Sequence, residues 1–123
     1  MASVTLEEIS HFRSKLATYP DILKALEVIE DCDGDLEDAA LVLAIEVGQQ
    51  PDSAVWLDGF AKRYRPALCE QAVRENLLNG ELAAVVEYLT GNQILPVILV
   101  APVLMYMIKQ GVNDFCEPLE LKL

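Results

Sequence analysis

Few side chains in this sequence can act as a nucleophile or as an acid–base group near neutral pH: His11, Cys32, Cys69 and Cys116. A catalytic cysteine needs a nearby histidine or positive site to form its thiolate, and His11 lies far along the chain from all three cysteines. The cysteines form no C-x-x-C pair and are too sparse for the disulfide framework of small secreted domains. We therefore expect no catalytic cysteine, and this spacing favours a reducing cytoplasm.

Two patterns imitate metal sites. The acidic residues of 31–35 resemble the start of a calcium loop, but the positions for its glycine and its bidentate glutamate are Leu36 and Val42. Glu8 and His11 have the E-x-x-H spacing of di-iron bundles, which need a second such motif and two further glutamates. The chain has one histidine. We expect no metal ligand, no cofactor and no catalytic residue.

One basic cluster is a candidate interaction site: Lys62, Arg63, Tyr64 and Arg65. It can dock an acidic or phosphate-bearing partner, with Tyr64 or an arginine available for stacking. Alternatively, it is the cationic last turn of a helix, paired with carboxylates near residues 30–38 of the same chain. The sequence favours the second interpretation.

The overall charge excludes one class of partner. Nine Lys and Arg against 20 Asp and Glu leave a net charge of -11, whereas binding to nucleic acid depends on Lys and Arg displacing counterions. An acidic mimic of nucleic acid is a minor alternative. Hydrophobic residues make up 53% of the chain, which predicts a packed domain. Charged residues interrupt the first 16 positions, so no secretion signal is expected there.

The elements that position these residues are all predicted to be helices. Thr5 and Glu8 form a capping box, Asp35 can cap a later helix, and prolines and glycines separate the apolar runs. No stretch alternates polar and apolar residues as a strand does. The expected helices cover residues 6–18, 20–32, 36–47, 53–64, 68–77, 82–89 and 94–108, and a short tail follows Gly111.

These elements predict an all-α fold, a compact single-domain bundle of about seven helices spanning 1–123. Proline and glycine recur at an offset of 46 residues, as in Pro20 and Pro66 or Gly34 and Gly80. An internal duplication of 5–48 and 51–91, two three-helix units plus a last apolar helix, is therefore an alternative to ordinary punctuation of a bundle.

The most apolar segment is 94–110. Pro96 suits a helix start, and Pro102 is expected to kink the helix or end its first turns. We expect a central buried helix. Excess apolar surface predicts a homodimer seam formed by Val103, Leu104, Tyr106 and Met107. A membrane contact through 94–108 is the alternative, although the strictly apolar part is short for a spanning helix.

Residues 26–44, with Gly34, Asp35 and Glu37 followed by Ala39 and Leu41, resemble the loop and second helix of ubiquitin-associated-type three-helix modules. The resemblance covers less than a fifth of the chain. It includes no counterpart of the hydrophobic loop that binds ligand in those modules, so no binding residue is transferred and no family is assigned.

Together these observations predict a non-catalytic, cytoplasmic protein-interaction or regulatory module. We expect it to self-associate and to bind another, unidentified protein through an apolar helix face rimmed by carboxylates. Two alternatives stay open. One is a membrane-associated helical protein using 94–108, and the other is a small-ligand carrier or enzyme with an aromatic pocket near Trp56, Tyr64 and Tyr88.

Overall fold

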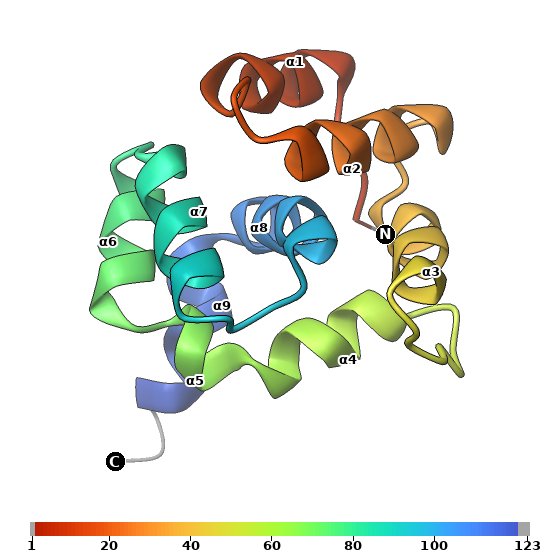
Figure 1. The fold of residues 1–123 in the computed structure, drawn as a ribbon. Helices are drawn as coiled ribbons and strands as arrows, with labels where there is room; N and C mark the ends of the chain where they lie inside the picture. The colour runs from red at the N-terminus through yellow and green to blue at the C-terminus, as the bar shows by residue number, and fades with distance from the viewer. Residues whose placement is uncertain (1, 121–123) are drawn as a thin grey trace.

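The computed structural model describes residues 2–120 and confirms an all-α fold (Figure 1). Helices surround α8, which runs through the middle of the molecule. The nine helices of this described range are α1 (Leu6–Lys15), α2 (Pro20–Asp31), α3 (Leu36–Glu46), α4 (Trp56–Arg63), α5 (Arg65–Leu68), α6 (Gln71–Leu78), α7 (Leu82–Gly91), α8 (Val97–Gln110) and α9 (Val112–Glu120).

The sequence predicts about seven helices, and it does not predict two of those found in the structure. The first is the single turn α5, where Pro66 stands in the first turn and needs no N–H partner. The second is α9, predicted as a tail. Gly111 ends α8 with a φ of 98°, and the chain then re-enters a helix that buries Val112, Phe115 and Cys116 at the spacing of one helix face.

The central helix α8 begins later than predicted and continues through its internal proline. Pro96 takes the N-cap position in an extended conformation, so the helix starts at Val97 rather than at 94. Pro102 lies inside the helix without ending it. The side chains from Ile98 to Met105 are buried, which confirms the central buried helix and argues against a membrane contact through 94–108. Across residues 2–120, every helix is too short or too polar to cross a bilayer.

The N-terminal segment is tied to the loop between α2 and α3. The N–H of Val4 donates to the carbonyl of Gly34 at 2.9 Å, and the N–H of Leu36 donates to the carbonyl of Ala2 at 3.0 Å. Gly34 has a φ of 82°, and a Cβ there would lie 2.1 Å from the carbonyl oxygen of Val4. This position therefore requires glycine. The attachment sets where α1 begins.

The predicted helix caps are confirmed. The Thr5 hydroxyl accepts from the N–H of Glu8 at 3.1 Å, and the Glu8 carboxylate accepts from the N–H of Thr5 at 2.9 Å. The Asp35 side chain accepts from the N–H of Asp38 at 3.1 Å. Asp35 thus begins α3, as the capping interpretation of the acidic run 31–35 predicted.

Two of the three cysteines are joined. Cys69, which follows α5, forms a disulfide with Cys116 in α9, and Cys32 is free. The sequence favours a reducing compartment because its three cysteines are sparse and form no C-x-x-C pair. The fold nevertheless joins Cys69 and Cys116 across 47 residues, so the spacing of the cysteines no longer supports a reducing compartment.

The predicted duplication of 5–48 and 51–91 stays a prediction. In both units a glycine with positive φ, 82° at Gly34 and 76° at Gly80, precedes an acidic N-cap and a helix that starts with a buried leucine. The units differ before that point. The first has one long helix, α2, where the second has the short α5 and then α6.

Candidate functional site

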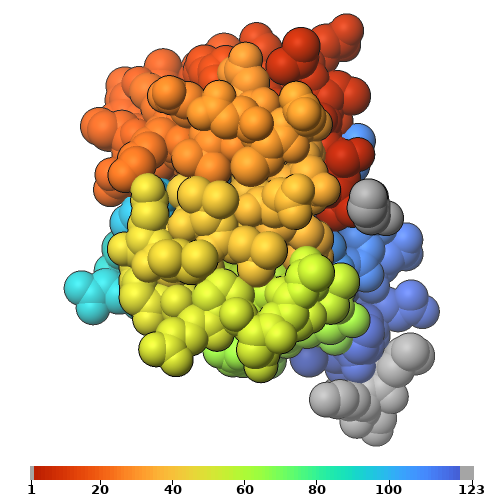
Figure 2. Space-filling model, turned by 90° about the vertical axis from the view of Figure 1, so that its right-hand side faces the viewer, coloured from red at the N-terminus to blue at the C-terminus, as the bar shows by residue number. Residues whose placement is uncertain are grey.

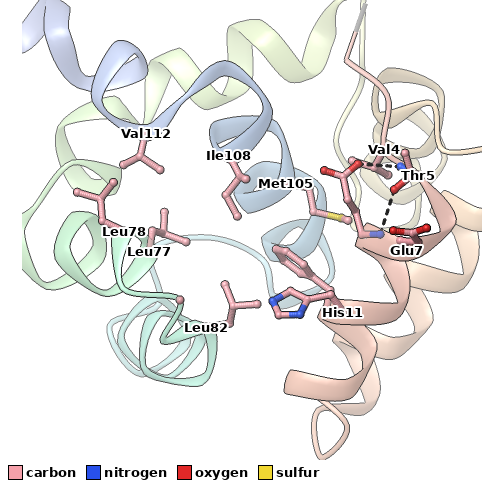
Figure 3. A pocket seen from close by; sticks show the side chains of 13 residues that line it. Val4, Thr5, Glu7, His11, Leu77, Leu78, Leu82, Met105, Ile108 and Val112 are labelled. Atoms are coloured by element: carbon pink, nitrogen blue, oxygen red, sulfur yellow. Dashed lines mark hydrogen bonds between the residues drawn. The ribbon is translucent and has the colours of Figure 1, made fainter.

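A groove in the surface lies between α1 on one side and α6 and α7 on the other, with α8 and the start of α9 as its floor (Figure 3). We call it the α1/α7 groove, and its cavity volume is about 610 Å³. Figure 3 shows side chains from all of these elements directed into one space. The described residues that line it are Val4, Thr5, Glu7, Glu8, His11, Phe12, Leu77, Leu78, Gly80, Leu82, Met105, Ile108 and Val112.

Hydrophobic side chains form most of this lining. Phe12, Leu82 and Met105 are buried at its base, whereas Leu78 is 54% exposed and Ile108 is 39% exposed. Exposed leucine and isoleucine beside a hollow apolar surface are typical of a binding site rather than of scattered surface residues. The sequence does not indicate this groove, because its lining comes from five helices and no local pattern joins them.

An ion pair connects α1 to the end of α8. The Glu8 carboxylate lies 2.9 Å from the Lys109 ammonium, and the same carboxylate caps the first turn of α1 at Thr5. Burial acts to raise the pKa of Glu8, but the hydrogen bonds from Lys109 and Thr5 outweigh it and hold the pKa below its usual value. Glu8 is therefore a fixed carboxylate that positions the wall.

Other polar contacts hold the walls of the α1/α7 groove together. The Tyr19 hydroxyl, after α1, donates to the Glu87 carboxylate of α7 at 2.6 Å. The Arg74 guanidinium of α6 donates twice to the side-chain oxygen of Asn113 in α9, at 3.2 and 2.9 Å. Each contact joins elements distant in the sequence, so the groove is built into the fold.

The rim of the groove is acidic. Glu7 in α1 is exposed and, among residues 2–120, takes part in no ion pair. Glu81 lies between the lining residues Gly80 and Leu82 and is exposed, but it is not itself part of the lining. The lining set within the described part of the chain includes no lysine or arginine, and Lys109 is bound to Glu8 at its edge. An occupant of the groove therefore meets an apolar floor and, at the α1 edge, the carboxylate of Glu7.

A second cavity, of about 710 Å³, lies beside the N-terminal segment. It is lined by Ala2, Ser3, Glu37, Val55, Asp58, Tyr106, Lys109 and Gln110. The Tyr106 hydroxyl donates to the Asp58 carboxylate, whose other oxygen lies 2.8 Å from the Lys62 ammonium. Glu37 accepts from the N–H of Leu57 at 2.9 Å and so caps α4 from α3. These polar groups satisfy one another and hold α3, α4 and α8 together.

The pKa shifts in this cluster follow from the same contacts. Burial raises the pKa of the Glu37 carboxyl, and the N–H groups at the start of α4 only partly offset this. Burial acts in the same direction on Asp58, but hydrogen bonds from Lys62 and Tyr106 prevail and lower its pKa. Burial and then the Asp58 carboxylate raise the pKa of Tyr106 far above its usual value. The cluster thus contains two carboxyls with opposite shifts.

The residues of the predicted basic cluster have contacts within the chain. Lys62 pairs with Asp58, one helical turn away, rather than with the carboxylates of 30–38. The Arg63 guanidinium lies 5.9 Å from the centre of the Phe60 ring. Arg65 lies over a second aromatic ring, that of Phe115, at 4.8 Å, and its Nε is buried without a hydrogen-bond partner among the described residues. Tyr64 is partly buried. Lys62 and Arg63 thus form the cationic last turn of α4, as the second interpretation expects, but the pairing with carboxylates of residues 30–38 is not found among the described residues.

The residues predicted to form a homodimer seam lie elsewhere than expected. Val103, Leu104 and Met107 are each 0% exposed within a single chain. Tyr106 is partly buried and bonded to Asp58. The expectation is corrected on this point, because the helices around α8 leave none of the three aliphatic side chains at the surface.

The aromatic residues of the ligand-pocket alternative do not come together around a cavity. Trp56 stacks on Phe60 with ring centroids 4.6 Å apart, and Phe60 contacts Tyr64 at 4.9 Å. Tyr88 lies in α7, on another part of the molecule. Neither cavity described above includes Trp56, Tyr64 or Tyr88 in its lining. This aromatic row fills space along α4.

A further exposed apolar region belongs to α3 and the segment that leads into α4. These elements cover much of the face seen in Figure 2. Val42 and Ile45 in α3, Val47 at its end, and Val55 before α4 are exposed. α3 has apolar residues on every side, and the bundle buries only one side of it.

No metal centre is found in the part of the chain that the structure describes, since it contains no group of three or more His, Cys, Asp or Glu residues placed to hold an ion. Comparison with models of known protein families, with curated proteins and with solved structures gives no match to this chain. The function is therefore argued from the geometry of the sites above.

Proposed function

We propose that this protein is a non-catalytic interaction module and that the α1/α7 groove is the surface on which another protein docks. The single observation behind this proposal is the hollow apolar surface with exposed Leu78 and Ile108 and acidic edges. It corresponds to the working surface that the sequence predicts, an apolar helix face rimmed by carboxylates, although it is formed by other residues.

The polar groups of the groove support a docking role over a reaction. Glu8 and Lys109 are bound to each other, and the Thr5 hydroxyl is occupied in the cap of α1. A catalytic site needs a base, a nucleophile and donors for developing charge around one point. The side chains that remain, Glu7 and His11, lie at the exposed edge, whereas the buried part of the lining is apolar.

A small-ligand carrier is the second candidate. The groove volume of about 610 Å³ falls in the range of ligand sites, roughly 300–1,000 Å³. Such sites bury most of their ligand. Leu78 and Ile108 stand exposed at this one, which favours a partner with its own extended surface.

A photo-crosslinking amino acid at position 78 tests the proposal in the native cell, and the same amino acid at position 45 is the matched control. Both sites replace exposed hydrophobic residues, Leu78 at 54% and Ile45 at 66% exposure. We expect an adduct with a different protein from position 78 alone, reduced at least about fivefold by Ile108→Ser, whereas position 45 should crosslink only to a second copy of this chain. Equal adducts with a different protein from both positions, no adduct from position 78, or no effect of Ile108→Ser would refute the proposal.

Self-association remains part of the proposal, and a cytoplasmic location is retained from the sequence although the Cys69–Cys116 disulfide is more typical of an oxidising compartment. With the α8 side chains buried, the exposed face of α3 with Val42 and Ile45 is the surface that supports a homodimer. Sedimentation over a wide concentration range tests this, and Ile45→Asp should shift the protein to monomer. Cell fractionation tests the location.

A further inference from the structure

The chemistry of the groove narrows the kind of partner that fits it, provided that the docking role proposed above is correct. Glu7 on α1 is an exposed carboxylate in the lining, and the exposed Glu81 at the start of α7 follows the lining residue Gly80 in the sequence. Glu7 has no cationic partner among residues 2–120, and the lining contributes no lysine or arginine there. The whole chain has a net charge of -11. A partner segment with positive charges beside its apolar residues complements this surface, whereas an acidic one is repelled.

The shape of the groove favours a helix as its occupant. Its walls are helices, and its floor includes Met105 and Ile108, one turn apart on α8, and Val112, which follows the break at Gly111. An amphipathic helix can lie in such an apolar groove with its anchoring side chains on one face. Leu78 adds an exposed apolar contact on one wall.

We propose that the α1/α7 groove binds an amphipathic, cationic helix of another protein. The apolar stripe of that helix covers Leu78 and Ile108, and lysines or arginines beside the stripe face Glu7 and Glu81. The same charges speed the encounter, because the acidic surface attracts a cationic segment before contact.

Three synthetic peptides of about 14 residues, labelled for fluorescence anisotropy, test this proposal on the full chain. The first has a leucine stripe with lysines beside it, the second has glutamates in place of the lysines, and the third has the composition of the first in an order that breaks the stripe. We expect the first to bind at least about tenfold more tightly than either other peptide, and to weaken as salt is added.

Two pairs of variants separate binding in the groove from attraction to an acidic protein in general. Leu78→Ser should weaken the binding of the leucine–lysine peptide about tenfold, and Val55→Ser, at a comparably exposed position outside the groove, should leave it unchanged. Glu7→Gln should weaken it about threefold. Glu27→Gln, which removes one exposed charge on α2, should have no effect.

The peptide measurements and the crosslink test different proposals: the peptides test the cationic helix, and the crosslink tests the docking role. If the glutamate peptide or the scrambled peptide binds as well as the first, or if Glu7→Gln and Glu27→Gln act alike, the inference about a cationic helix is wrong. The docking role then still rests on the crosslink from position 78. If that crosslink fails, the proposed function is wrong whatever the peptides do.

Discussion

Reduction of the Cys69–Cys116 disulfide should destabilise this protein by about 4 kcal/mol. The two cysteines are 47 residues apart, and the loop that they close includes α6, α7 and α8. In the chain-entropy model, a crosslink over this length removes about 14 cal/mol/K of entropy from the unfolded chain, which amounts to about 4 kcal/mol at 25 °C. This figure assumes that the folded state keeps its other contacts on reduction, and the burial of Phe115 and Cys116 in the core favours that.

Urea unfolding with and without a strong reductant measures this effect. With a slope of roughly 2 kcal/mol/M for a small domain, the midpoint should fall by about 2 M on reduction. Cys32→Ser is the control, since Cys32 is free and its variant should show the same fall. A midpoint that moves by less than about 0.5 M would refute the reasoning, because the unfolded chain would then gain little freedom from the open loop.

Three further changes test the contacts that position the two cavities. Gly34→Ala should lower the free energy of unfolding by more than about 3 kcal/mol, because the new Cβ would lie 2.1 Å from a backbone oxygen at a residue with positive φ. Gly80 has a similar φ but open space around it, so Gly80→Ala should lower the free energy of unfolding by about 1 kcal/mol. Thermal unfolding measures both changes. Tyr106→Phe removes a hydrogen bond that lowers the pKa of Asp58. A carboxyl whose pKa is lowered by folding stabilises the fold at pH values above its pKa in the unfolded chain, and this stabilisation is lost as the pH falls through its pKa in the folded protein. Tyr106→Phe should therefore lower the free energy of unfolding by about 1 kcal/mol at pH 7. In urea unfolding at a series of pH values, the variant should lose less stability than the unchanged protein as the pH falls. The pKa of Glu37 is raised, so its ionisation costs stability as pH rises above the unfolded pKa; Glu37→Gln should remove this fall, and an unchanged pH profile would contradict the assigned burial.

Local chemistry explains which parts of the fold could be predicted. Thr5 and Asp35 act within a few residues of their own positions, through helix caps that need no distant partner. The apolar run 94–108 predicted burial because a helix without a polar side needs neighbours all round. These features therefore appear in the structure much as the sequence indicates them.

Long-range contacts explain what could not be predicted. The burial of α9 depends on α5 and α6 beside it, and its apolar residues looked like a short tail because Gly111 separates them from α8. The disulfide needs this same approach of Cys116 to Cys69. The α1/α7 groove exists because five helices meet at one place. In the sequence, only the neighbouring leucines Leu77 and Leu78 point to it, because a helix that packs on one side can bury just one of them and leaves the other exposed.

The distribution of apolar residues also changes where interaction surfaces should be sought. The most apolar helix, α8, has a sequence that suggests surplus hydrophobic surface, yet its buried side chains pack against α2, α3, α4, α7 and α9. The large hydrophobic residues that stay exposed are spread over several helices and include Leu78 on α6, Ile45 on α3 and Ile108 near the end of α8. Single exposed hydrophobic residues are common on protein surfaces, but Leu78 and Ile108 border one hollow apolar surface. In this bundle, the docking surface is therefore indicated by where exposed hydrophobic residues gather around a cavity, and not by which helix is most apolar.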